Sequence, residues 1–179
     1  MIEIMSKHIQ ALPHTQRVFR KGQYLFHQGD AVVSMFLIET GEARLLRRQR
    51  DGNTLVLQRA LPGSFLAEAS LFTANYHCDA TATTRISARL ISRKAMRKLF
   101  GSDPAFAAAW ASHLAGEVRS ARLRAEILAL KTVAERLSAW TAANGKFPPR
   151  GTWKTVAQEI GASPEALYRE IAQRRRGKR

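Results

Sequence analysis

Residues 152–176, TWKTVAQEIGASPEALYREIAQRRR, contain two short helical patterns separated by a glycine. Gly161 ends the first pattern. The second begins at Ser163, where a preferred N-cap residue is followed by Pro164 in the first helical position and Glu165 in the first turn. Apolar residues at helical spacing supply the faces that would pack the two helices together: Val156, Ala157, Ile160, Leu167 and Ile171. The pattern predicts a helix-turn-helix.

The second helix of such a motif places its first turns in the major groove of DNA. Glu165 can accept a hydrogen bond from a cytosine amino group, and Arg169 can pair with guanine through two hydrogen bonds. Thr152, a candidate N-cap, and Ser163 carry hydroxyls that can donate to phosphates. The arginines at the basic end can contact phosphates whatever the base sequence. The expected DNA-binding residues are Thr152, Ser163, Pro164, Glu165, Tyr168, Arg169, Arg174, Arg175 and Arg176.

The charge of the whole chain favours the same kind of partner. Twenty-nine Lys and Arg residues against fourteen Asp and Glu residues give a net charge of +15. Such an excess favours a polyanion, either nucleic acid or an anionic membrane surface. The alternative interpretation is that the two helices only pack on each other and that the basic end is a solvated surface.

The first half of the chain predicts a β-rich domain. Between residues 17 and 93, short apolar runs alternate with turn residues, and Asp51-Gly52-Asn53 is typical of a hairpin turn. Many short strands at spacings of about 8 to 12 residues predict a sandwich or a barrel. The expected strands include residues 18–19, 24–26, 35–38, 43–46, 55–57 and 89–91.

A long helix is predicted from residue 104 to about residue 130. Ser102-Asp103-Pro104 can cap its start, and Gly116 is the single glycine within it. A second helix is expected from Thr132 to Ala143. One apolar stripe follows the long helix and favours a partner helix, with packing on the chain's own β domain as the alternative. The stripe comprises Phe106, Trp110, Leu114, Ala121, Ala125 and Leu128.

We therefore expect an α+β protein in three parts. Residues 1–101 would form a β sensor domain, residues 102–131 a dimerisation helix, and residues 132–179 the helix-turn-helix domain. No apolar run is long enough to span a membrane, and the N-terminus has no apolar signal core, so we expect a cytoplasmic protein with no membrane partner. Cys78 is the single cysteine, which excludes an internal disulfide and any site that needs several thiolates.

The chain resembles the Crp/Fnr family of bacterial transcriptional regulators. The resemblance rests on FRKGQYLFHQGD at residues 19–30, FLIETG at residues 36–41 and LPGSF at residues 61–65. It implies an N-terminal double-stranded β-helix, a jelly roll of the cyclic nucleotide-binding type, followed by a long dimerisation helix and a helix-turn-helix. It also implies a homodimer that binds a palindromic operator in double-stranded DNA, with RNA polymerase as a further partner. Family members continue into a β-hairpin wing, and this sequence ends soon after Arg169, so it resembles a shortened member without the wing.

The ligand-binding residues are where this sequence departs from the family. Members that bind cyclic nucleotides hold the ribose and phosphate with a Gly-Glu pair and an Arg-Ser or Arg-Thr pair. Here Glu68 is retained, Ala67 replaces the glycine, and Cys78-Asp79 stand at the Arg-Ser positions. Losing the guanidinium removes the bidentate phosphate partner, so cyclic AMP is not expected to bind. The candidate pocket residues are Glu68, Ala69, Ser70, Cys78, Asp79 and Arg122.

The effector and two other classes of function stay open at this point. No cofactor is predicted, and a small-molecule or redox effector is left unspecified. The run YHCD at residues 76–79 offers a haem, metal or redox-thiol site, or simply a packed cysteine beside a surface histidine. The chain could instead be a ligand-sensing or protein-interaction module whose basic tail binds RNA or anionic surfaces. An enzyme is not expected, because no nucleophile, base and orienting group occur together in the sequence.

Overall fold

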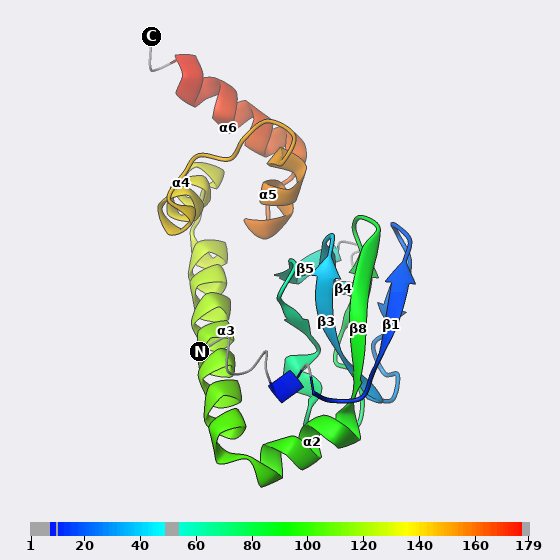
Figure 1. Ribbon diagram of the computed structural model, residues 1–179. Coiled ribbons are helices and arrows are strands. Elements are labelled where there is room, and N and C mark those ends of the chain that lie inside the picture. Colours follow the sequence, from blue (N-terminus) through cyan, green and yellow to red (C-terminus); the bar gives the residue numbers. More distant parts are fainter. Residues whose placement is uncertain (1–7, 10, 49–53, 177–179) are drawn as a thin grey trace. The chain divides into compact units, whose positions relative to one another are not determined.

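The computed structural model describes residues 8–9, 11–48 and 54–176 (Figure 1). The chain divides into two compact units, Met1–Glu117 and Val118–Arg179. The three-part division at residues 101 and 131 stays a prediction. The expected turn at residues 51–53 lies outside the described residues.

Two four-stranded antiparallel sheets form the first unit (Figure 1). One has the order β1 (His14–Phe19), β8 (Ile86–Ser92), β3 (Ser34–Thr40), β6 (Phe65–Leu66), and the other β2 (Tyr24–Phe26), β7 (Asp79–Ala82), β4 (Ala43–Arg48), β5 (Thr54–Ala60). The strands expected from the sequence are all present, and β4 and β5 pair from Ala43↔Ala60 to Arg48↔Thr54 as the expected hairpin requires. This arrangement confirms the predicted α+β fold with its N-terminal β-roll.

The core of the first unit combines alternate residues of both sheets with the beginning of a long helix. Phe106 and Trp110, on α3 (Pro104–Ala129), are completely buried there, and the Trp110 ring centre lies 5.3 Å from that of Phe65. Leu114 packs against the same core. Phe106 and Trp110 therefore pack on the chain's own β domain, which was the alternative interpretation of the stripe, and the place of Leu114 in a seam stays a prediction.

Two short helices of the first unit follow strands in the chain. The 3₁₀ helix η1 (Glu68–Ser70) lies after β6, and α2 (Arg93–Ser102) follows β8 directly. Asp103 caps α3 as expected, since its Oδ1 accepts a hydrogen bond from the Phe106 backbone N–H at 3.0 Å.

The second unit contains α4 (Val133–Asn144), α5 (Trp153–Glu159) and α6 (Pro164–Arg176). Thr132 and Glu135 form a capping box at the start of α4, and Gly145 ends that helix with a φ of 68°. The five apolar residues expected to lock α5 to α6 are all buried in one cluster, together with Ile127 and Leu137. The sequence prediction of this helix pair is confirmed.

A tight turn at Gly161 joins α5 to α6. Gly161 has a φ of 61°, and the Ala162 backbone N–H donates to the Ala157 carbonyl at 2.9 Å. A Cβ atom at position 161 would lie 2.8 Å from Leu128 Cδ2, which is closer than real Cβ contacts. Glycine is thus required here both by the backbone conformation and by the close approach of Leu128.

None of the helices in the described part of the chain combines the length and the apolar character that crossing a membrane requires.

Candidate nucleic-acid interface and ligand cassette

The first turns of α6 present three side chains to solvent. Glu165, Tyr168 and Arg169 are exposed or partly exposed, whereas Leu167 and Ile171 are buried against the rest of the second unit. Glu165 and Arg169 are four residues apart, so they lie on the same face of the helix. This face carries one hydrogen-bond acceptor and one forked donor, the pair of groups that the sequence analysis expected to contact bases.

Ser163 fixes the start of this helix and the charge state of its first acidic residue. Its Oγ accepts a hydrogen bond from the Ala166 backbone N–H at 3.2 Å. Hydrogen bonds from the backbone N–H of Glu165 and from the Ser163 hydroxyl hold the pKa of the Glu165 carboxyl below its usual value, with a smaller effect of the Arg169 charge. Glu165 is therefore an ionised acceptor at neutral pH.

Two of the residues expected to contact phosphates form hydrogen bonds within the chain. Arg174 lies half-buried, where its Nε donates to Glu170 Oε1 at 2.6 Å and its Nη2 donates to the Ala134 carbonyl and to Ser138 Oγ. Thr152 donates its hydroxyl proton to the Pro149 carbonyl at 2.9 Å. Both side chains therefore contribute to the fold, and their expected phosphate contacts stay predictions.

Arg175 and Tyr168 gather around Trp153. The Arg175 guanidinium lies 5.1 Å from the centre of the Trp153 ring, and the Tyr168 ring centre is 5.6 Å away from it. The Trp153 indole N–H donates to the Pro148 carbonyl at 3.0 Å, which holds the ring in place. Tyr168 and Arg175 are exposed members of this cluster, and both lie on α6.

The candidate ligand pocket predicted from the sequence, here called the ligand cassette, includes Glu68 in the first unit. Hydrogen bonds link the acidic and amide groups of this cassette. Glu68 is buried, and the Gln58 amide Nε2 donates both to Glu68 Oε1 at 3.1 Å and to Glu117 Oε2 at 3.2 Å. Gln58 Oε1 is buried without a hydrogen-bond partner among the described residues. Before Glu68, Ala67 adopts a left-handed conformation with a φ of 68°, which favours glycine. The cassette thus presents acceptors and carboxylates.

Cys78, which directly precedes β7, and Asp79, its first residue, have different surroundings. Cys78 is buried, and burial raises the pKa of its thiol to about 11. Asp79 Oδ1 accepts a hydrogen bond from the Gln28 backbone N–H at 2.8 Å, and His27 Nδ1 lies 3.6 Å from the same oxygen. Neither Cys78 nor Asp79 offers a cation to a phosphate.

The three remaining candidate pocket residues differ in their burial and their contacts. Ser70 is buried with its Oγ 3.4 Å from His77 Nδ1, whereas Ala69 is exposed. Arg122 is exposed in the second unit, and its expected role beside the cassette stays a prediction. No group of three or more metal-binding side chains comes together in the part of the chain that the structure describes.

Two polar residues of the cassette escaped the sequence analysis. Gln58 lies on β5 and Glu117 on α3, and Glu117 is far from Glu68 along the chain. Gln58 breaks the apolar run of its strand at LVLQ, which was the available signal, but the sequence does not show that Glu117 meets it. Arg47 was also missed, and its Nη2 donates to the His77 carbonyl at 2.8 Å.

Comparison with known proteins places these features in a family context. Residues 16–103 match the cyclic nucleotide-binding domain family. Among curated proteins, none matches this sequence. Similar solved structures include FixK2 from Bradyrhizobium japonicum, with 22% identity and a TM-score of 0.77 over 90% of this chain and 84% of that chain.

Two further structures extend the same likeness. The c-di-GMP responsive global regulator CLP from Xanthomonas campestris has 17% identity and a TM-score of 0.77, covering 99% of this chain and 93% of that chain. A transcriptional regulator of the CRP/FNR family from Thermus thermophilus has 22% identity and a TM-score of 0.69, covering 91% of this chain and 87% of that chain.

The family match and the solved structures agree on the fold. The chain as a whole has the fold of the Crp/Fnr transcriptional regulators, and the resemblance seen in its sequence is confirmed.

Proposed function

We propose that this protein is a sequence-specific, DNA-binding transcriptional regulator of the Crp/Fnr type. The observation that carries the proposal is the outward face of α6, where ionised Glu165 and Arg169 stand side by side on a helix whose other face is buried. Such a face can accept from a cytosine amino group and donate twice to guanine. The net charge of +15 supplies the general attraction to the phosphate backbone.

We further propose that the regulator binds a palindromic operator as a homodimer. Beyond Phe106, Trp110 and Leu114, which pack on the β domain, the apolar stripe of α3 has exposed members at Ala121 and Ala125, and Val118 beside them is 47% exposed. These three positions follow the spacing of a helix–helix seam. A dimer of this type would place two copies of α6 about 34 Å apart, one turn of DNA.

The cassette supports an effector other than cyclic AMP. A cyclic nucleotide brings a phosphate, and its expected surroundings here contain Glu68, Glu117 and Asp79, with an unpartnered acceptor on Gln58. The carboxylates repel a phosphate, and the Arg47 guanidinium near Cys78 already donates to the His77 carbonyl. Titration of the full chain with cyclic AMP should therefore leave its DNA affinity unchanged, and contact with RNA polymerase stays a prediction of the family likeness.

Competition binding tests the proposal. Labelled duplex DNA bound to the full chain would be challenged with unlabelled duplexes of genomic and of scrambled sequence, over a series of salt concentrations. A specific regulator should prefer some duplexes at every salt concentration by about 10³-fold or more over scrambled DNA. If all duplexes compete equally and binding vanishes with salt alone, the chain is a non-specific polyanion binder.

A further inference from the structure

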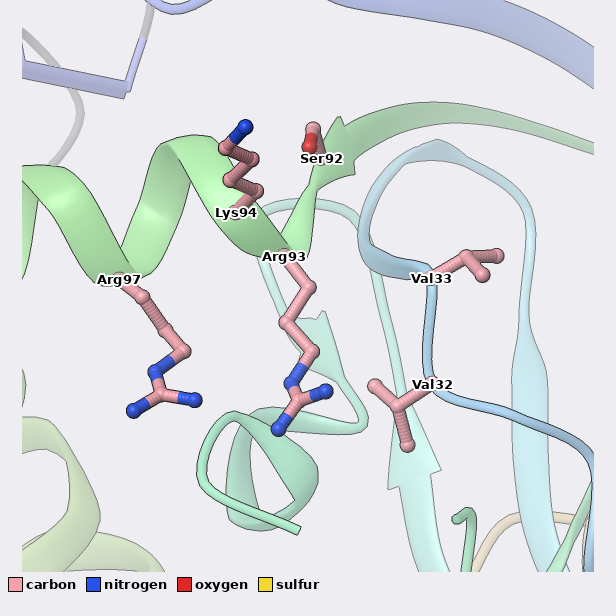
Figure 2. Close-up of a pocket in the computed structure, with 6 residues that line it drawn as sticks. All are labelled: Val32, Val33, Ser92, Arg93, Lys94 and Arg97. Atoms are coloured by element: carbon pink, nitrogen blue, oxygen red, sulfur yellow. The ribbon is translucent and has the colours of Figure 1, made fainter. Parts of the chain in front are cut away.

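A hollow of about 450 Å³ lies on the surface of the first unit, between the start of α2 and the segment that leads into β3 (Figure 2). Arg93, Lys94 and Arg97 line it from α2, and Val32 and Val33 form its apolar wall. None of the described residues that line it is an aspartate or a glutamate. Pockets of about 300–1,000 Å³ are typical of small-molecule sites.

Arg93 is partly buried, yet none of the described carboxylates pairs with it. Arg44 and Arg89, which are also partly buried, each pair with a glutamate, at 2.9 and 2.8 Å. Arg93 instead donates from its Nε to the Leu71 carbonyl at 3.0 Å. Removing a cation from water is costly unless an anion pairs with it. The terminal nitrogens of Arg93 therefore favour an anion that comes from solution.

Two guanidinium groups are held ready for such an anion. Figure 2 shows that the Arg93 and Arg97 side chains extend to the same side of α2, whereas Lys94 projects to the other side. The bond to Leu71 fixes Arg93, and the Arg97 guanidinium lies 5.6 Å from the centre of the Phe72 ring. These contacts order both side chains before a ligand arrives, which lowers the entropy cost of binding.

The start of α2 also favours an anion. Arg93 and Lys94 occupy its first turn, where the helix dipole disfavours positive charge. Arg93 and Arg97 are four residues apart, a spacing at which like charges repel. Ser92 occupies the N-cap position and lines the hollow, but its side chain makes no capping bond. A bound anion would offset both the repulsion between the cations and the positive end of the helix dipole.

The groups around the hollow fit a phosphoryl group better than a carboxylate. Each guanidinium presents a fork of parallel N–H donors, which matches two oxygens of a phosphate. A phosphate monoester carries a charge of about −1.5 to −2 and three acceptor oxygens, enough for two forks. A carboxylate has two oxygens and a single charge. Val33, which is 69% exposed, adds apolar surface for the carbon portion of a ligand.

We infer that this hollow binds a small organic phosphate, a monoester whose oxygens pair with Arg93 and Arg97 and whose carbon portion packs on Val33. Leu71, which accepts from Arg93, directly follows η1, and η1 carries Glu68 of the ligand cassette. The site is thus a second ligand position of the first unit, next to the cassette but outside it. It does not depend on DNA recognition by α6.

Isothermal titration calorimetry of the full chain with phenyl phosphate tests this inference. Phenyl phosphate should bind at a single site per chain. Benzoate, which has the same ring and a carboxylate, should bind about tenfold or more weakly. Methyl phenyl phosphate is a diester with one negative charge, like the phosphates of nucleic acids and phospholipids. It should also bind about tenfold or more weakly than the monoester.

Arg97→Gln should weaken phenyl phosphate binding by about tenfold or more, because it removes charged donors to the ligand. Arg97 is exposed, so thermal denaturation should show the variant folded as the wild-type chain is. Lys98→Gln is the matched control, because it removes the same charge from an exposed position of α2 that does not line the hollow. It should change the affinity by less than about twofold.

Absence of phenyl phosphate binding would overturn the inference. Equal effects of Arg97→Gln and Lys98→Gln would show attraction to net charge alone and would also overturn it, as would equally tight binding of benzoate or of the diester. If Arg97→Gln weakens duplex DNA and phenyl phosphate binding to the same extent, the surface binds nucleic acid instead. The DNA competition experiment uses no phosphate monoester, so its failure is distinguishable from failure of this inference.

Discussion

The three arginines at the end of α6 differ in what their guanidinium groups contact. Arg174 binds Glu170, Ala134 and Ser138, Arg175 lies over a tryptophan ring, and Arg176 is exposed. The sequence shows only a run of identical residues. Successive positions on a helix point about 100° apart, so packing against α4 decides which arginine is used by the fold. The sequence therefore predicted the basic end of α6 but not which of its arginines contact the rest of the domain.

Replacing Arg174 should destabilise the second unit. Arg174→Ala removes charge-assisted hydrogen bonds to α4, and we expect a loss of about 1–2 kcal/mol in the free energy of unfolding, discounted for partial solvent exposure. Arg176→Ala should change that free energy by less than about 0.5 kcal/mol. Chemical denaturation of both variants provides the measurement. Equal stability losses would contradict the structural role assigned to Arg174.

Cys78 should be a slow thiol in the folded protein. Its pKa of about 11 lies above the value of an unfolded cysteine, about 8.5, so the folded state favours the neutral form. The stability that this difference contributes is present below about pH 8.5 and is lost as the pH rises toward about 11. At about pH 8, labelling by a thiol reagent should be about 100-fold slower in the folded chain than in urea. Rapid labelling of the folded chain would instead favour a redox role for Cys78.

At the scale of elements, periodicity and capping predicted the long strands and the helices from α3 to α6. The missed elements have physical reasons. β6 has two residues, and β7, with the sequence DATA, has short side chains with weak strand preference. The helix α2 begins with cations and has no side-chain capping bond, so the usual signals of a helix start are absent. Tertiary contacts form these elements: β6 pairs with β3, β7 pairs with β2 and β4, and α2 packs against β8.

The turn between α5 and α6 gives a prediction at the same scale. Gly161→Ala should cost about 1–2 kcal/mol for the left-handed backbone, and a further cost of about 1–3 kcal/mol for the contact with Leu128. Gly145→Ala is the matched control, because Gly145 has a similar φ of 68° and a Cβ atom added there would meet nothing within 4 Å. Thermal denaturation should place the Gly161 variant below the control. The reverse order would show that the Leu128 side chain moves away from the added Cβ atom at little cost in free energy.

At the scale of the whole molecule, the ligand cassette was the least predictable feature. Gln58, Glu68 and Glu117 meet through hydrogen bonds although they come from separate elements of the chain. A single sequence gives the residue types but no pairings over such separations. The same limit explains the apolar stripe of α3, whose period predicted a buried face but not that Phe106 and Trp110 pack on their own domain.

The exposed part of that stripe predicts self-association. Val118→Glu would place a charge in the proposed seam between two copies of α3, so it should weaken the dimer by about tenfold or more. Ser120→Glu introduces the same charge at an exposed position on another face of the helix and should leave association unchanged. Sedimentation of both variants over a range of protein concentrations measures the effect. A wild-type chain that stays monomeric throughout would contradict the proposed dimer.

Selection of bound DNA from a random pool tests the central claim most directly. The full chain should enrich an inverted repeat with half-sites about one helical turn apart. Arg169→Ala should relax the preference at one symmetric base pair by about 1–3 kcal/mol, and Glu165→Ala should relax it at a neighbouring position. Arg176→Ala should weaken all sequences alike. Recovery of no preferred sequence by the wild-type chain would contradict the role of α6 as a base-reading helix.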